Sequence, residues 1–239
     1  MSRSALDRAR RLWADLARVP AMFPERGGVS VVVSPQSWMC PPGWTGVIAL
    51  DGAILATVPS ADLVESVRGA LLHHLARTTV DLALLPPRLR ALDHLGPATL
   101  AYLDADDLVA AHTDAQVESL PVGHHDVREL VASVGEQDAD ECGLEEISSE
   151  AFVIREGRKV IAAAGHQQWL SMAAHMSVLT ARDHRGRGLA RRVASAAVAD
   201  ALARGLLPQW RARPEPSRHV ARALGFREFG SQISILLRR

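Results

Sequence analysis

The chain has 239 residues, enough for two compact domains, and its 48% hydrophobic content is enough to bury a core, which excludes global disorder. Its 27 basic residues balance 27 acidic ones, so net charge indicates neither a nucleic-acid partner nor an anionic membrane. The two cysteines, Cys40 and Cys142, suggest reduced thiols and no thiolate metal site. Without an apolar run of signal-peptide or membrane-span length, we expect a cytoplasmic protein that binds no metal.

The amino-terminal segment Leu6 to Val19 has the spacing of an amphipathic helix. Asp7 and Asp15 interrupt its basic charge, which favours packing against its own domain over membrane contact. The apolar face consists of Leu6, Ala9, Leu12, Trp13 and Leu16.

An α/β pattern follows. The β-branched run Val29–Val33 predicts a strand, and Asp51-Gly52 predicts a tight turn between two strands, 46–50 and 53–58. A helix is expected over 61–77, and the unit ends near Asp107. We therefore expect an amino-terminal α/β domain, residues 1–112.

A segment with few large apolar residues, Ala110 to Gln116, predicts the connector to a second domain, 113–239. The second domain should contain a strand at 117–120, a helix at 124–134, an acidic loop or short helix at 135–146, a hairpin turning at Glu156-Gly157 and a long strand, Met172–Thr180. Both halves contain a strand, an Xaa-Gly turn and a strand. The first domain is thus either a degenerate copy of the second or an unrelated unit, since hairpins are common.

The most informative stretch is Met176 to Gly205. An apolar strand leads into the turn Arg185-Gly186-Arg187-Gly188, and the amphipathic helix Leu189–Arg204 follows. The unpaired N–H groups of the first helical turn point outward at the positive end of the helix dipole. Glycine lets a phosphate approach this backbone, so the segment predicts a pyrophosphate site.

Two other interpretations of the turn, an RNA-binding tail and a dinucleotide-binding motif, are disfavoured. Arg-Gly repeats occur in disordered RNA-binding tails, but those lack an apolar strand before and an amphipathic helix after the repeat. A dinucleotide fingerprint requires a third glycine where this chain has Arg191.

Strand, Arg-Gly-Xaa-Gly-Leu-Ala and helix together resemble the acetyl-coenzyme A motif of the GCN5-related N-acetyltransferase (GNAT) superfamily. Trp210, Ser217 and the segment Ala221 to Phe226 continue the resemblance. It implies a mixed sheet flanked by helices that splays open for the cofactor, closed by strands within Phe229–Leu237. The chain departs from the family pattern at Arg182, Asp183 and Pro214.

The resemblance also implies the residues that contact acetyl-coenzyme A. The strand residues Val178, Leu179 and Thr180 would bind the pantetheine arm through their backbone, although they could also be plain core and edge residues. Ser217 would reach the same arm or serve as a helix cap. The pyrophosphate would lie on the amides of Arg185, Gly186, Arg187, Gly188, Leu189 and Ala190.

The catalytic residues are not identified by this resemblance. Glu136 and Glu141, with Asp138 and Asp140, lie in the segment where the family binds its acceptor. On the long strand, positions an even number before Thr180 are Met172, Ala174 and Met176, none of which accepts a proton, and His175 points to the other face. Glu136, Glu141 and His175 therefore stay as weak candidates. The tyrosine that many relatives use as the acid is absent, because the sole tyrosine is Tyr102 and the matching position is Ala221.

The resemblance implies an N-acetyltransferase that moves an acetyl group from acetyl-coenzyme A to an amine of a small molecule or peptide. The alternative is a non-catalytic acyl-coenzyme A-binding regulatory module. The sequence leaves the oligomeric state open, a homodimer included, and we expect the amino-terminal domain to cover or complete the acceptor site.

Overall fold

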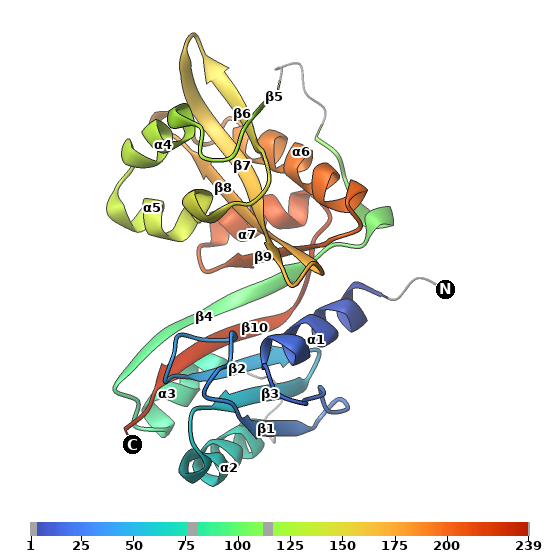
Figure 1. The fold of residues 1–239 in the computed structure, drawn as a ribbon, viewed down its shortest axis with the longest axis vertical. Coiled ribbons are helices and arrows are strands. Elements are labelled where there is room, and N and C mark those ends of the chain that lie inside the picture. Colours follow the sequence, from blue (N-terminus) through green and yellow to red (C-terminus); the bar gives the residue numbers. More distant parts are fainter. Residues whose placement is uncertain (1–3, 76–80, 112–116, 239) are drawn as a thin grey trace. The chain divides into compact units, whose positions relative to one another are not determined.

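The computed structural model describes residues 4–75, 81–111 and 117–238. The chain forms two compact units (Figure 1). The first contains residues up to Ala101 together with Ala212–Pro214 and Glu228–Arg239, and the second contains Tyr102–Arg211 and Glu215–Arg227. The domain boundary expected at residues 112 and 113 lies outside the described residues and stays a prediction. None of the described helices is long and apolar enough to cross a bilayer.

The first unit begins with helix α1 (Ala5–Leu16). Ser4 caps it, because its hydroxyl accepts the N–H of Asp7 at 3.3 Å. The apolar face of α1 is buried, which confirms the predicted amphipathic helix.

The strands of the first unit lie in the order β1-β3-β2-β10-β4. The predicted turn at Asp51-Gly52 joins β2 to β3, with φ angles of 47° and 74°. The bounds are β1 (Val29–Val33), β2 (Thr45–Leu50), β3 (Ala53–Val58), α2 (Val64–Leu75), α3 (Leu85–Arg88), β4 (Asp93–Tyr102) and β10 (Arg227–Leu236), with short 3-10 turns at Ala61–Leu63 and Leu82–Leu84.

Strand β10 differs from the sequence-based expectation that the final strands close the second domain. It pairs antiparallel with β2 from Gly230 opposite Leu50 to Ile235 opposite Thr45. Its Ile233 and Ile235 are fully buried in the core of the first unit. A Cβ at Gly230 would lie 1.8 Å from the carbonyl oxygen of Ala49, so glycine permits this close approach.

The strands of the second unit lie in the order β9-β8-β7-β6-β5. They are β5 (Glu118–Leu120), β6 (Ala151–Glu156), β7 (Lys159–Trp169), β8 (Ala173–Thr180) and β9 (Leu207–Ala212). The helices are α4 (His125–Ala132), α5 (Glu136–Cys142), α6 (Leu189–Ala203) and α7 (Glu215–Ala223), with 3-10 turns η3 (Ala105–Asp107), η4 (Leu144–Glu146) and η5 (Arg182–His184). The acidic segment 135–146, expected as a loop or a short helix, contains the short helix α5 and the turn η4.

Helices cover both faces of this sheet (Figure 1). His166 of β7 lies opposite Met176 of β8, and its ring contacts Asp200 of α6. The hydroxyl of Ser177 instead donates to the carbonyl of Gly143, which follows α5. Because side chains alternate along a strand, even-numbered residues of β8 face α6 and odd-numbered ones face the side of α5. The mixed α/β fold, with a sheet flanked by helices and an additional amino-terminal α/β unit, confirms the predicted fold class.

Candidate functional site

The glycine-rich turn joins β8 to α6. Gly186 and Gly188 have φ angles of 75° and 74°, which an L side chain rarely adopts. A Cβ at either position would meet nothing within 4 Å. The left-handed backbone, not crowding by neighbouring atoms, therefore requires glycine here, and the turn leaves open space beside its main chain.

The amino terminus of α6 lacks a side-chain cap. Gly188 is its N-cap residue and offers no hydroxyl or carboxylate to the first turn. The amides that begin with Leu189 and Ala190 thus lie at the positive end of a 15-residue helix without a capping side chain. This arrangement fits an anion such as a pyrophosphate.

Both arginines of the turn already contact carboxylates. Arg185 donates to Asp138 of α5 at 2.7 Å and to the carbonyl oxygen of Thr180 at 3.3 Å. Arg187 lies 4.0 Å from Glu156, whose pKa is lowered chiefly by a hydrogen bond from His184. Around half of each side chain in the Arg185–Asp138 pair is exposed, and exposed ion pairs are weak, so a phosphate can compete for Arg185.

Strands β8 and β9 diverge toward the carboxyl end of β8, which leads into the glycine-rich turn. All of β8, from Ala173 to Thr180, pairs with β7, but only Ala173, Ala174 and His175 pair with β9. From Met176 onward, none of the described strands pairs with the β9 side of β8. The backbone of Val178, Leu179 and Thr180 therefore borders an opening of the sheet. The Thr180 hydroxyl is buried, and no group in the described part of the chain hydrogen-bonds to it.

Ser217 lies inside α7 and is not its cap, because α7 begins at Glu215. Its hydroxyl accepts the indole N–H of Trp210 at 3.0 Å, and Trp210 packs edge-on against Phe226. The three residues that carried the downstream resemblance are therefore brought together.

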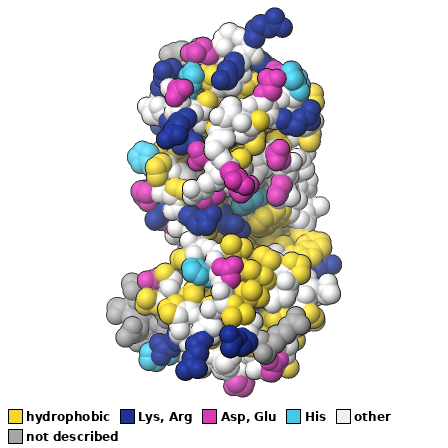
Figure 2. All heavy atoms as spheres, turned by 90° about the vertical axis from the view of Figure 1, so that its left-hand side faces the viewer, with side chains coloured by type: hydrophobic (Ala, Val, Ile, Leu, Met, Phe, Trp, Pro, Cys, Tyr) yellow, Lys and Arg dark blue, Asp and Glu magenta, His cyan; other side chains and the backbone are white. Residues whose placement is uncertain are grey.

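The catalytic candidates lie on two elements. Glu136 and Glu141 are exposed on α5. Figure 2 shows acidic side chains among those on one face of the molecule. His175 stacks on Trp169, with ring centroids 4.5 Å apart. Burial, and secondarily the charge of Arg211, lowers the pKa of His175 to about 3. The ring is thus neutral at physiological pH.

The even-numbered residues of β8, which we expected to face the reacting groups, lie on the side of the sheet that α6 covers. Ala174 and Met176 are buried on that face. Tyr102 is fully buried, and Ala221 is buried in α7. Sequence reasoning did not single out Gln209, a fully buried polar residue of β9 with neither amide atom hydrogen-bonded. A glutamine between apolar neighbours, Pro208 and Trp210, was the available clue.

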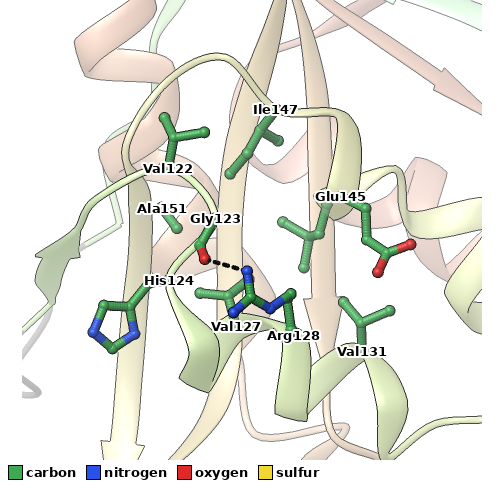
Figure 3. Close-up of a pocket in the computed structure, with 10 residues that line it drawn as sticks. Val122, Gly123, His124, Val127, Arg128, Val131, Glu145, Ile147 and Ala151 are labelled. Atoms are coloured by element: carbon green, nitrogen blue, oxygen red, sulfur yellow. Dashed lines mark hydrogen bonds between the residues drawn. The ribbon is translucent and has the colours of Figure 1, made fainter.

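A small pocket of about 250 Å³ lies between α4 and the segment after α5 (Figure 3). Apolar side chains dominate its wall, including Val127, Val131 and Ile147. Arg128 at its edge donates to the carbonyl of Gly123 at 2.7 Å. The pocket borders Ala151 of β6 and not the opening between β8 and β9, so we do not assign it to the candidate site.

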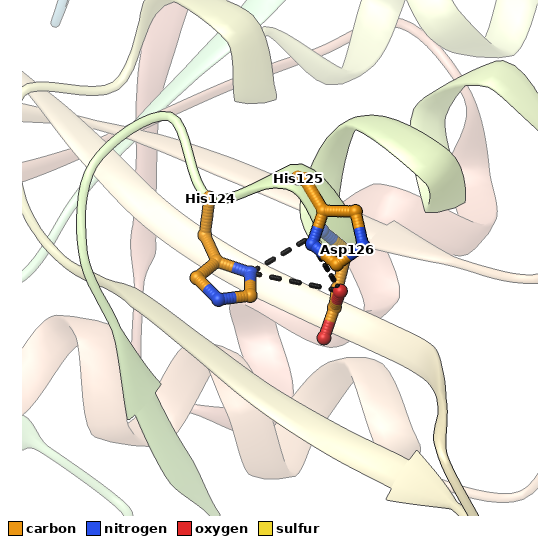
Figure 4. Close-up of side chains that lie close together, drawn as sticks. All are labelled: His124, His125 and Asp126. Atoms are coloured by element: carbon orange, nitrogen blue, oxygen red, sulfur yellow. Dashed lines mark hydrogen bonds and ion pairs between the residues drawn. The ribbon is translucent and has the colours of Figure 1, made fainter.

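His124, His125 and Asp126 gather at the start of α4, with ligand-type atoms within 4.8 Å of one another (Figure 4). The N–H of Asp126 already occupies Nδ1 of His124 at 3.2 Å, and Arg155 binds the Asp126 carboxylate at 2.6 Å. The hydrogen bond from Arg155 is the main cause that lowers the pKa of Asp126. Because a cation is disfavoured beside this guanidinium and at a helix amino terminus, we interpret the cluster as a cap of α4.

Residues 150–231 match the family model described as GNAT acetyltransferase. No curated protein matches the chain.

Three solved structures are similar. A GNAT-family protein from Novosphingobium aromaticivorans is 23% identical over 61% of this chain and 65% of its own, with a TM-score of 0.46. A GCN5-related N-acetyltransferase from Kribbella flavida is 19% identical over 64% and 62%, with a TM-score of 0.49. A tandem GNAT protein from the clavulanic acid biosynthesis pathway is 14% identical over 98% and 96%, with a TM-score of 0.47. This chain spans less than two thirds of the first two. The residues that match the GNAT acetyltransferase model therefore lie in the carboxy-terminal half of this chain.

Proposed function

We propose that the second unit binds acetyl-coenzyme A and transfers its acetyl group to an amine of a small molecule or peptide. The observation that carries this proposal is the divergence of β8 and β9 beside the uncapped amino terminus of α6. The pyrophosphate would lie on the amides from Arg185 to Ala190. The pantetheine arm would then run along the open side of Thr180, Leu179 and Val178, as an added strand does.

The transfer itself requires a neutral amine. Its nitrogen attacks the thioester carbonyl carbon, the carbon–sulfur bond breaks, and the thiolate leaves as coenzyme A after taking up a proton. The amine proton passes to Glu136, to Glu141 or to water. His175 is a poor acceptor for it, because a ring with a pKa near 3 does not hold a proton at neutral pH.

Two properties of the sequence bear on the compartment and the partners of the reaction. The balanced charge favours no nucleic-acid partner, and the two cysteines are free thiols, so we also propose that the reaction takes place in the cytoplasm.

The substitution Gly186→Glu tests the cofactor site. A glutamate would place negative charge where the pyrophosphate binds, so affinity for coenzyme A should fall at least tenfold, ~1.4 kcal/mol. Calorimetry measures this. Gly205→Glu is the matched control, because Gly205 also has positive φ and open surroundings but ends α6. Equal affinities of a folded Gly186→Glu protein and the control would reject the assignment.

A second candidate function is acyl-coenzyme A binding without transfer. The buried Tyr102 and the alanine at position 221 favour it, because no tyrosine is available in α7 to protonate the thiolate. An amine panel assayed beside a coenzyme A binding measurement separates the two. Tight binding with no acetylated product from any amine would select the binding module.

A further inference from the structure

Gln209 has a buried amide with no hydrogen-bond partner among the described residues. Its exposure is 0%, and neither Nε2 nor Oε1 is bonded to any of them. Such a group costs free energy of folding, and native proteins rarely keep one without a use. Its two neighbours in β9, Pro208 and Trp210, are also buried, so the amide is the exception within this strand.

The side chain next to Gln209 across the strands is His175. The two residues are register partners, and Nδ1 of His175 is likewise buried without a hydrogen bond. The imidazole is held by its stack on Trp169, whose indole N–H donates to Gln167 at 2.8 Å. Packing therefore fixes the imidazole of His175 beside Gln209, while no hydrogen bond from the described residues fixes the Gln209 amide.

Gln209 and His175 also form the last pair before β8 and β9 diverge. If the pantetheine arm enters from Thr180 and follows β8, it covers five residues before it reaches this pair, about 17 Å of strand. The acetyl group at the end of the arm would then meet the closed end of the opening. Gln209 thus lies in the strand pair at the end of the opening, where the thioester is expected.

We propose that Gln209 is a catalytic residue whose Nε2 donates a hydrogen bond to the thioester carbonyl oxygen. This inference rests on the proposed function. As the amine nitrogen bonds to the carbonyl carbon, negative charge develops on that oxygen, and the amide N–H stabilises it until the carbon–sulfur bond breaks. Because Gln209 is fully buried in this structure, the proposed hydrogen bond requires its side chain to reach the opening when acetyl-coenzyme A binds.

Substitution Gln209→Leu removes the donor and keeps the size of the side chain. Turnover should fall about 10² to 10³-fold, the range for loss of one such donor, with affinity for coenzyme A unchanged. The thermal midpoint should rise, because leucine replaces a buried, unpartnered amide. Gln209→Glu also removes the N–H donor, because a carboxylate of the same shape only accepts hydrogen bonds. Its turnover should fall at least as much as that of Gln209→Leu. Gln168→Leu on β7, at an exposed site, is the matched control.

A binding readout independent of the acceptor uses acetyl-coenzyme A isotope-labelled at the carbonyl. Its infrared carbonyl band should lie at lower frequency on the unmodified protein than on Gln209→Leu. Unchanged bands and turnover within threefold of the unmodified protein would overturn the role of Gln209 while leaving the acetyltransferase proposal intact. A lowered thermal midpoint with normal turnover would show that an ordered water satisfies the amide. Failure of the unmodified protein to bind acetyl-coenzyme A would remove both proposals.

Discussion

At the scale of single residues, the environment of His175 decides what its imidazole can do. Burial is the larger cause, and the charge of Arg211 the smaller, that lowers its pKa from 6.5 to about 3. The neutral ring stacks on Trp169 and leaves Nδ1 unpaired. We therefore expect His175 to pack beside a ligand and not to act as a general base.

The same pKa predicts how stability depends on pH. The folded protein resists protonation of His175, while the unfolded chain takes up this proton below about pH 6.5. Above that pH the residue contributes no pH dependence, and as pH falls from 6.5 toward 3 stability is lost, by up to ~1.4 kcal/mol per unit. Urea unfolding between pH 7 and 4.5 should show a shallower loss for His175→Gln than for the unmodified protein. The exposed His219→Gln serves as control, and identical slopes for all three proteins would contradict the shifted pKa.

The lowered pKa of His175 also predicts the effect of His175→Ala on turnover. Because a ring with this pKa holds no proton at neutral pH, we expect turnover to fall less than tenfold in a folded variant. Steady-state kinetics with an identified acceptor measures this. A hundredfold drop with intact coenzyme A affinity would identify His175 as the general base.

At the scale of elements, the two units differ in how a strand leads into a helix. Between β8 and α6 the chain has Gly186 and Gly188 at positive φ, so the first helical turn has no side-chain cap. Between β3 and α2 the residues from Pro59 to Leu63 include no glycine, and a 3-10 turn at Ala61–Leu63 precedes the helix. Only the first of these connections has the open backbone that a pyrophosphate requires.

This difference predicts one coenzyme A per chain. Calorimetric titration should give a stoichiometry of one, abolished together with affinity in Gly186→Glu. A stoichiometry of two would mean that the first unit also binds the cofactor, and it would support the reading of that unit as a degenerate copy that kept its function.

At the scale of the whole molecule, sequence order and structural units do not coincide. Strand β10 is close to the end of the chain, yet it pairs with β2 and fills the core of the first unit with Ile233 and Ile235. A cut near residue 112 would therefore separate β10 from its partner.

We accordingly expect a fragment of residues 113–239 to be poorly soluble when expressed alone, because β10 would expose two isoleucines and an unpaired edge. A fragment of residues 117–226, without β10, is the matched comparison and should be more soluble. Yield and light scattering measure this. A monomeric, fully active 113–239 fragment would contradict the prediction and would show that the first unit is dispensable.

The glycine-rich turn, helix α6 and the hairpin at Asp51-Gly52 were all predictable from sequence, because positive φ angles and helical periodicity are local properties of a few adjacent residues. Strand pairing joins residues far apart in the chain, so sequence left open that β10 pairs with β2 and that β9 leaves β8 after His175. The same holds for Gln209, whose meaning depends on burial and on missing partners that only packing decides. Sequence by itself thus determined the glycine-rich turn at which we propose that an anion binds, and the tertiary structure decided which residues lie where β8 and β9 diverge.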